Sequence, residues 1–217
     1  MNITIFGATG ATGAIGQLLT QFALENGDIV TVYVRNPEKI KQKHSNLRIV
    51  TGELTNTSAI ETAVSEADVV ISTLGPGIDL SRKQKGTPIA DGHNRIVKAM
   101  KKFTKKRLIT LATPALQSED DKKSLSTILP RILPKLLMPN GYAEMKKMGE
   151  LIKQSNLDWT VVRIINPNIK YNGQSYGYSF GDQPAKMSVS RENVAKLMYD
   201  AARQHQLIGK MPIVYND

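Results

Sequence analysis

The sequence predicts an α/β fold in which a doubly wound parallel β-sheet lies between two layers of helices. Short runs rich in β-branched residues alternate with helical segments along the first two-thirds of the chain, which implies parallel strands joined by right-handed crossovers. A glycine-rich turn directly follows the first of these runs. With 217 residues, of which 41% are hydrophobic and 22% charged, the chain has the composition of one ordinary globular domain.

Seven strands and six helices are expected from the spacing of the apolar residues. The strands cover residues 2–6, 29–34, 47–51, 68–74, 107–112, 159–165 and 212–215. The helices lie near residues 14–26, 37–44, 56–66, 88–103, 141–155 and 190–204. Asn36 before Pro37, and Thr87 before Pro88, each place a capping residue ahead of a proline at the first helical position.

We expect these elements to form a single domain, residues 1–217, with substrate-side loops near residues 75–87, 114–140 and 166–188. The first two loops follow strands whose carboxyl ends would form the ligand crevice of such a sheet, so they are candidate walls or lids over a substrate. The leucine-rich residues 129–138 fit equally well an amphipathic helix that packs on the domain or joins two copies. A monomer or a homodimer is therefore expected.

The composition excludes several classes of protein. Because the chain has no cysteine, it cannot be a disulfide-stapled module, a thiolate zinc site, an iron–sulfur protein or a cysteine-nucleophile enzyme. Its histidines, His44, His93 and His205, are scattered and predict no metal site. The first residues lack the pattern of a signal peptide, and no apolar run approaches the roughly 18 residues that span a bilayer. A cytoplasmic protein without membrane contact is expected.

A net charge of +10 makes an anionic partner a candidate: nucleic acid, a membrane surface or a phosphorylated small molecule. The basic residues 101–107 are typical of a solvated helix end, where cations complement the helix dipole. No nucleic-acid-reading motif is visible, so nucleic acid is the least favoured of the three partners.

The glycine-rich turn is the sharpest functional signal. Gly7 can adopt the positive φ of a tight turn, Gly10 lets the backbone approach a pyrophosphate, and Gly13 lets helix and strand pack closely. The helix that follows offers unpaired N–H groups and a partial positive charge to phosphates. The turn therefore predicts a dinucleotide-binding Rossmann fold, the alternative being a glycine turn without a ligand. Its residues are Gly7, Ala8, Thr9, Gly10, Ala11, Thr12 and Gly13, and the threonine hydroxyls add donors beside the N-terminus of the helix.

The spacing Gly-x-x-Gly-x-x-Gly resembles that of the atypical and extended short-chain dehydrogenase/reductase superfamily, particularly its NmrA-like and biliverdin reductase B (flavin reductase) branch. The resemblance covers most of the chain and implies an NAD(P)-binding oxidoreductase. Besides residues 7–13, it rests on residues 32–39 (second strand and turn), 52–54 (after the third strand), 71–75 (fourth strand), 155–163 (entry to the sixth strand) and 190–195 (start of the last long helix).

The end of the second strand indicates which nicotinamide cofactor is preferred. An NAD-selecting enzyme usually has an acidic residue there, whereas the 2′-phosphate of NADP calls for a cation. Here Arg35 occupies the strand end and Lys39 follows one helical turn later, so two cations are available for one phosphate. NADP(H) is therefore preferred over NAD(H). The alternative is that both cations belong to a solvated basic surface that continues through Lys41 and Lys43.

The resemblance implies further cofactor contacts after the third and fourth strands. Glu53 and Leu54 correspond to residues beside the adenine, although Glu53 stands where the family usually has aspartate. Leu74 and Gly75, preceded by Thr73, correspond to residues that contact the cofactor ribose.

The superfamily's proton machinery is Tyr-x-x-x-Lys on a helix, with a Ser or Thr upstream. Spacing of four places Tyr and Lys on one helical face, where the cation can lower the phenol pKa. Tyr142 and Lys146 match this pattern, and Thr113 follows the fifth strand, where it would face the nicotinamide. Because the pattern arises easily by chance and the flavin reductase branch commonly lacks the tyrosine, an ordinary lysine-rich surface helix is the alternative.

Two other features carry less weight. His93 is expected at the surface or as a helix-capping residue rather than as a base. A group of aromatic residues on the substrate side could stack on a flat ring or pack inside a small hairpin. These aromatic residues are Tyr171, Tyr176, Tyr178 and Phe180.

The sequence thus favours an NADPH-dependent reductase acting on a flavin, a quinone or another conjugated small molecule. Hydride transfer belongs to the nicotinamide, so the protein need only align an acceptor and supply a proton where the product requires one. Two alternatives stay open: a non-catalytic NADP(H)-sensing regulator of the NmrA-like kind, and a sugar epimerase or ketone dehydrogenase using Tyr142.

Overall fold

The computed structural model describes residues 1–9, 13–75, 86–122, 138–167, 170–181 and 188–217. These residues form an eight-stranded sheet with the strand order β3-β2-β1-β4-β5-β6-β8-β7. All neighbouring strands are parallel except β7 and β8. The strands are β1 (Asn2–Phe6), β2 (Ile29–Val34), β3 (Leu47–Thr51), β4 (Val69–Ser72), β5 (Arg107–Ala112), β6 (Asp158–Arg163), β7 (Tyr176–Ser179) and β8 (Ile213–Asn216).

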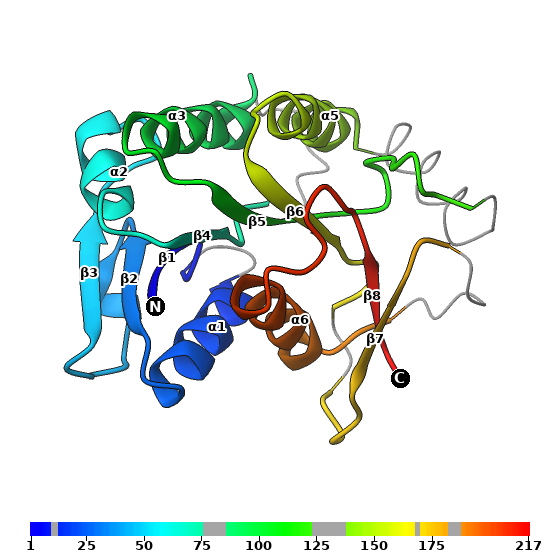
Figure 1. Ribbon diagram of the computed structural model, residues 1–217, viewed down its shortest axis with the longest axis horizontal. Helices are drawn as coiled ribbons and strands as arrows, with labels where there is room; N and C mark the ends of the chain where they lie inside the picture. Colours follow the sequence, from blue (N-terminus) through cyan, green and yellow to red (C-terminus); the bar gives the residue numbers. More distant parts are fainter. Residues whose placement is uncertain (10–12, 76–85, 123–137, 168–169, 182–187) are drawn as a thin grey trace.

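Helices cover both faces of the sheet, which confirms the expected doubly wound, three-layer architecture (Figure 1). On one face α1 (Gly13–Glu25) packs against α6 (Arg191–Arg203). On the other face α3 (Pro88–Lys102) lies between α2 (Thr57–Val64) and α5 (Pro139–Lys153). In the part of the chain that the structure describes, no helix is both long and apolar enough to cross a membrane.

The alternation of side chains along β1 shows how the sequence builds both faces of the core. Ile3 and Ile5 are buried in the hydrophobic cluster beneath α1 and α6. Phe6 points to the opposite cluster, beneath α2, α3 and α5, and the Thr4 hydroxyl on that side donates to the Ala63 carbonyl of α2 at 2.6 Å. Because successive strand residues face opposite sides, a run that is apolar on both faces produces a sheet buried between two layers of helices.

Two sequence predictions about individual elements are wrong. The helix expected over residues 37–44 is only a single 3-10 turn, Pro37–Lys39, capped by the Asn36 side chain, which accepts from the Glu38 N–H at 2.9 Å. Ile40 already has extended backbone angles, and the following residues are Lys41, Gln42 and Lys43, so this segment has no apolar face that could hold a helix on the core.

The sheet also has one strand more than the sequence predicts. β7 pairs antiparallel with β8, and it forms the edge of the sheet beyond the last parallel strand. Its sequence, Tyr-Gly-Tyr-Ser, is short and contains a glycine, so apolar periodicity does not reveal it.

The sheet topology defines where a ligand would bind. The chain runs outward from β1 through β2 to β3, then returns to the other side of β1 with β4 and continues through β5 to β6. The strand order therefore reverses between β1 and β4, and in open α/β sheets ligands bind at this point, outside the carboxyl ends of the strands.

Candidate dinucleotide site

A cavity of about 550 Å³ lies at the carboxyl ends of β1, β2, β3 and β4, beside the N-terminal half of α3. Seven of the residues predicted to bind cofactor line it, together with residues that the sequence did not point to. The lining residues are Gly7, Thr9, Tyr33, Val34, Arg35, Gly52, Glu53, Leu54, Thr55, Leu74, Gly75, Pro88, Ile89, Asp91 and Arg95.

The turn after β1 has the geometry that a glycine motif requires. Gly7 has φ +96°, and a Cβ at this position would lie 2.7 Å from the Thr73 Oγ1. Thr73 is fully buried, and its hydroxyl donates to the Phe6 carbonyl at 3.2 Å, so it supports the turn from behind and does not line the cavity. Gly10, Ala11 and Thr12 lie outside the described residues.

A close approach between α1 and the glycine-rich turn occurs at Gly16. A Cβ on Gly16 would lie 2.7 Å from the Ala8 Cα, so only glycine permits this separation. Sequence reasoning assigned the close packing to Gly13, which is the first residue of α1. The result is the same, because the N-terminus of α1 is held against the end of β1, where it can face a phosphate.

The two predicted phosphate-binding cations lie in different places. Arg35 follows β2 directly and lines the cavity with Gly7 and Glu53. Lys39 lies in the 3-10 turn and borders a separate recess with Gln17 and Gln42. The difference follows from the local structure, because a single 3-10 turn does not place residue 39 above residue 35 as an α-helix would.

The segment after β3 forms the wall expected for an adenine. Glu53 and Leu54 both line the cavity, and the Tyr33 hydroxyl donates to the Glu53 carbonyl at 2.7 Å. Burial and the nearby Glu53 carboxylate raise the pKa of Tyr33, so its phenol stays neutral and serves as a donor. A Cβ on Gly52 would collide with the Tyr33 Oη. Tyr33 and Gly52 were not predicted as site residues, although both belong to segments that carry the family resemblance, residues 32–39 and 52–54.

The opposite wall comes from α3, which sequence reasoning did not connect with the cavity. Asp91 and Arg95 lie one helical turn apart on the cavity side, and the Arg95 Nη1 donates to the Asp91 carbonyl at 3.2 Å. A Cβ on Gly92 would lie 3.0 Å from the Leu54 Cδ1, so this glycine allows α3 to pack closely against the segment after β3. In the sequence, Asp91 and Arg95 stand out as an oppositely charged pair at spacing i, i+4. Many surface helices carry such pairs, so the spacing does not indicate a ligand site.

His93, on the same helix, is fully buried, so the expectation of a surface or capping residue is wrong. Its Nδ1 lies 2.9 Å from the Ile89 carbonyl and must carry a proton, since a carbonyl only accepts. The Nε2 therefore accepts, from the Ser72 hydroxyl at 2.9 Å and the Thr110 hydroxyl at 3.2 Å. Burial lowers the pKa of His93 to about 4, which keeps the ring neutral.

This histidine ties α3 to the sheet just beneath the cavity. The Ser72 oxygen also accepts from the backbone N–H of Leu74 at 3.4 Å, and Leu74 lines the cavity. Thus the end of β4 and the helix that faces it are joined through a buried polar network rather than through apolar packing alone.

The N-terminus of α3 is capped from another helix. Thr87 makes no capping bond with its side chain. Instead, the buried Glu144 carboxylate of α5 accepts from the Ile89 N–H at 3.3 Å and the Ala90 N–H at 3.1 Å. The neighbouring Lys147 donates to Thr87 Oγ1 at 2.7 Å and pairs with Asp91 at 2.8 Å. Helix α5 therefore holds the first turn of α3, which borders the cavity.

The predicted catalytic residues lie on two different elements, the end of β5 and helix α5. Thr113 follows β5, as expected, and is half-buried. Tyr142 is half-buried in the first turn of α5. The Lys146 side chain is 65% exposed and pairs with Glu150 at 3.8 Å along the same helix. None of the three lines the nucleotide cavity.

Comparison with known proteins agrees with this geometry. A family described as NAD(P)H-binding matches residues 10–205, which is most of the chain. A short-chain dehydrogenase/reductase from Veillonella parvula DSM 2008, solved in complex with NADP, has a TM-score of 0.79 at 22% identity, covering 99% of this chain and 94% of that one. ChuY, an anaerobillin reductase from Escherichia coli O157:H7, has a TM-score of 0.75 at 17% identity, covering 100% and 97%.

A third similar structure is the oxidoreductase ylbE from Lactococcus lactis, with a TM-score of 0.74 at 19% identity over 100% of this chain and 91% of that one. At these identities the likeness concerns the fold, and it confirms the predicted Rossmann architecture. The family match over residues 10–205 and the glycine turn at the switch point together show that this chain belongs to the NAD(P)H-binding family.

Proposed function

We propose that the protein binds NADP(H) in the cavity at the carboxyl ends of β1 to β4 and uses NADPH to reduce a small conjugated acceptor, such as a flavin or a quinone. The observation that carries the cofactor assignment is Arg35. It lines the same cavity as the Gly7 turn, and it follows β2, where an NAD-selecting site would have an acidic residue.

The residues present fit a dinucleotide. A Cβ at Gly7 would lie 2.7 Å from the Thr73 Oγ1, so the tight turn that borders the cavity depends on glycine there. The N-terminus of α1 supplies partial positive charge, and Arg35 offers a planar pair of donors to the 2′-phosphate. Glu53 and Leu54 would border the adenine on one side, with the Asp91–Arg95 turn of α3 on the other.

When bound, NADPH supplies the hydride, and the protein's task is to hold the acceptor beside it and to exclude water. Thr113 follows β5, at the edge of the sheet where a Rossmann site carries out its chemistry, and its hydroxyl can donate to an acceptor atom that gains charge. Reduction of a conjugated ring needs no tyrosine–lysine pair, which agrees with the exposed position of Lys146.

The similarity to ChuY, an anaerobillin reductase, and to a structure solved with NADP supports a reductase that uses NADPH. The test is to follow absorbance at 340 nm while the protein, NADPH and either FMN or a quinone are mixed. We expect turnover that requires both protein and acceptor and that is faster with NADPH than with NADH. Absence of turnover with every conjugated acceptor would contradict the proposed activity.

A second candidate is a non-catalytic NADP(H) sensor, which the exposure of Lys146 and its pairing with Glu150 favour over a working Tyr-x-x-x-Lys pair. It predicts tight cofactor binding without hydride transfer, together with a protein partner whose affinity differs between NADP⁺ and NADPH. An epimerase or ketone dehydrogenase that depends on Tyr142 predicts instead that Tyr142→Phe abolishes nearly all turnover, while leaving NADPH binding intact.

A further inference from the structure

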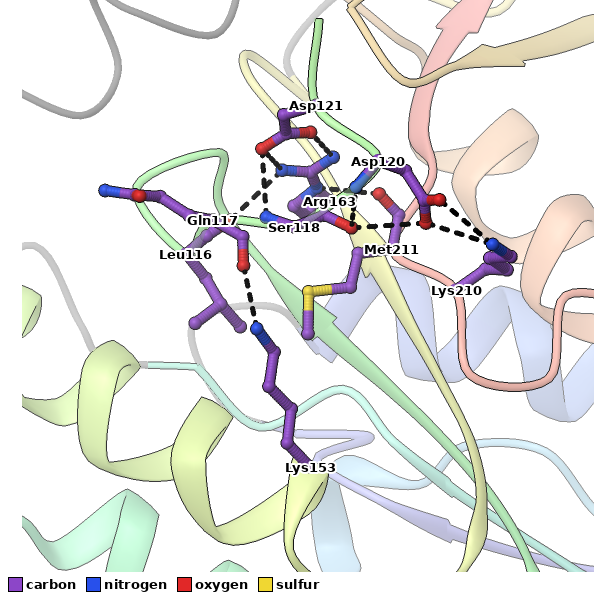
Figure 2. A network of polar contacts seen from close by, with 9 residues as sticks. All are labelled: Leu116, Gln117, Ser118, Asp120, Asp121, Lys153, Arg163, Lys210 and Met211. Atoms are coloured by element: carbon purple, nitrogen blue, oxygen red, sulfur yellow. Dashed lines mark hydrogen bonds and ion pairs between the residues drawn. The ribbon is translucent and has the colours of Figure 1, made fainter.

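An ion pair between a fully buried arginine and a partly buried aspartate joins the end of β6 to the segment after β5 (Figure 2). Arg163, the last residue of β6, is fully buried, and its Nη1 and Nη2 donate to the two carboxylate oxygens of Asp121 at 2.8 and 2.5 Å. The Arg163 Nε also donates to the Met211 carbonyl at 2.8 Å, and Nη1 to the Leu116 carbonyl at 3.1 Å. One guanidinium thereby joins β6 to two other segments of the chain, residues 116–121 and Met211.

Asp121 closes a compact turn at the start of the substrate-side loop. Its Oδ2 accepts from the Ser118 N–H at 3.0 Å, and its own N–H donates to the Ser118 carbonyl at 3.2 Å. The next residue, Lys122, donates its N–H to the Phe180 carbonyl just beyond β7 at 2.8 Å. The Asp121 carboxylate thus fixes the point where the loops after β5 and β6 meet, and both loops were predicted to form the substrate side.

The same arginine reaches the predicted nicotinamide-facing residue in two steps. Arg163 donates to the Leu116 carbonyl, and the Leu116 N–H donates to the Thr113 carbonyl at 3.0 Å. The turn from Thr113 to Leu116 is therefore held between β5 on one side and Arg163 on the other.

Stability alone is a weak reason for a charge pair in this position. A buried ion pair loses the hydration of both ions, and replacing it with well-packed apolar residues is often neutral or stabilising. What the fork geometry of arginine adds is a defined direction for each bond, which an apolar contact would not supply.

We infer that Arg163, paired with Asp121, is a positioning residue that fixes Thr113 and the wall formed by residues 116–122 relative to the bound acceptor. This inference rests on the proposed reductase function. It assigns no chemical step to Arg163, which acts through the backbone of the turn that carries Thr113.

Arg107 provides a matched control for Arg163. Arg107 begins β5, at the end of the β5–β6 pair opposite to Arg163, and is also buried. Its guanidinium donates to three backbone carbonyls, those of Asp158, Ala201 and Gln206, each at 2.8 Å. An Arg→Lys change at either site removes a buried fork of donors, but only the change at Arg163 lies beside the predicted reaction site.

The experiment compares Asp121→Asn, Arg163→Lys, Arg107→Lys and the apolar double variant Asp121→Leu/Arg163→Met with the unmodified protein. For each, the Kd for NADPH, the kcat and KM for a quinone acceptor, and the midpoint of thermal unfolding are measured. We expect the three variants at the Asp121–Arg163 pair to bind NADPH as the unmodified protein does and to lose about tenfold or more in kcat/KM for the acceptor. The double variant should show this loss even if its unfolding midpoint is unchanged.

The Arg107→Lys variant should lose stability with little change in kcat/KM. Two outcomes would overturn the inference: variants at the Asp121–Arg163 pair that keep the kcat/KM of the unmodified protein, or losses that merely follow the loss of stability and equal those of Arg107→Lys. If the unmodified protein binds NADPH but transfers no hydride to any acceptor, the proposed function is wrong, and the inference is wrong with it. The two failures are therefore distinguishable.

Discussion

At the scale of single residues, we expect the proposed selectivity for the 2′-phosphate to depend on Arg35, because Arg35 lines the cavity while Lys39 borders a different recess. Arg35→Ala should weaken NADPH binding by about tenfold to a hundredfold, the loss expected for one or two charge-assisted hydrogen bonds, and should change NADH binding little. Lys39→Ala is the matched control and should change the NADPH-to-NADH affinity ratio much less. Isothermal titration of both variants with both cofactors measures the ratio, and a larger effect of Lys39→Ala would contradict this assignment.

His93 predicts a pH dependence of folding stability. Burial lowers the pKa of His93 from 6.5 to about 4 in the folded protein. Between these two pH values His93 is protonated in the unfolded chain but stays neutral in the folded protein. Stability is therefore lost as the pH falls from about 6.5 to about 4, by about 3 kcal/mol over the whole window at roughly 1.4 kcal/mol per pKa unit.

The measurement is urea unfolding of the unmodified protein and of His93→Gln at several pH values between 7 and 4. The difference in unfolding free energy between the two should shrink as the pH falls. Glu144 works in the opposite direction, because burial raises its pKa and the folded protein keeps that proton longer, but it contributes equally to both proteins. A difference that is independent of pH would show that His93 is not buried in the neutral form.

At the scale of elements, the Glu144 carboxylate of α5 caps the N-terminus of α3. This cap connects the helix that was predicted to carry catalytic residues with the wall of the cavity. Glu144→Ala removes the acceptor for the Ile89 and Ala90 N–H groups, and we expect a loss of about 1–3 kcal/mol in unfolding free energy together with weaker NADPH binding. Glu150→Ala, at an exposed position on the same helix, should change stability by less than about 0.5 kcal/mol.

Denaturant unfolding and NADPH titration of these two α5 variants provide the test. Equal effects of the two changes on NADPH binding would mean that the cap does not shape the cavity. A stability loss for Glu144→Ala with unchanged NADPH affinity would limit Glu144 to a role in folding.

Most strands and helices could be predicted from apolar periodicity, because each buries one or both faces against the same core. The segment at residues 37–44 could not, since its lysines have no apolar face to pack, and β7 could not, since its four residues gain their order from pairing with β8. In the site, the residues at strand ends were predictable because topology alone brings them together. Asp91, Arg95 and the Glu144 cap were not, because they depend on how α3 and α5 dock, which involves contacts distant in sequence.

At the scale of the whole molecule, the strands of the sheet span residues 2 to 216, and we expect the loops between these strands to form the substrate side. The net charge of +10 is not concentrated in the cavity, where Arg35 and Arg95 lie with Glu53 and Asp91. The proposed selectivity therefore rests on the placement of one guanidinium. A general positive potential would contribute less, because salt screens it within about 8 Å at physiological ionic strength.

Competition between adenosine fragments is the most direct test of NADP(H) binding in this cavity, because one fragment carries the 2′-phosphate, the other does not, and neither carries the nicotinamide. Protein saturated with NADPH, followed by the fluorescence of the bound cofactor, is titrated with 2′,5′-ADP and separately with 5′-ADP. We expect 2′,5′-ADP to displace NADPH at a concentration at least about tenfold lower, and Arg35→Ala to abolish most of this difference. Equal displacement by the two fragments, or no saturable NADPH binding, would contradict the assignment.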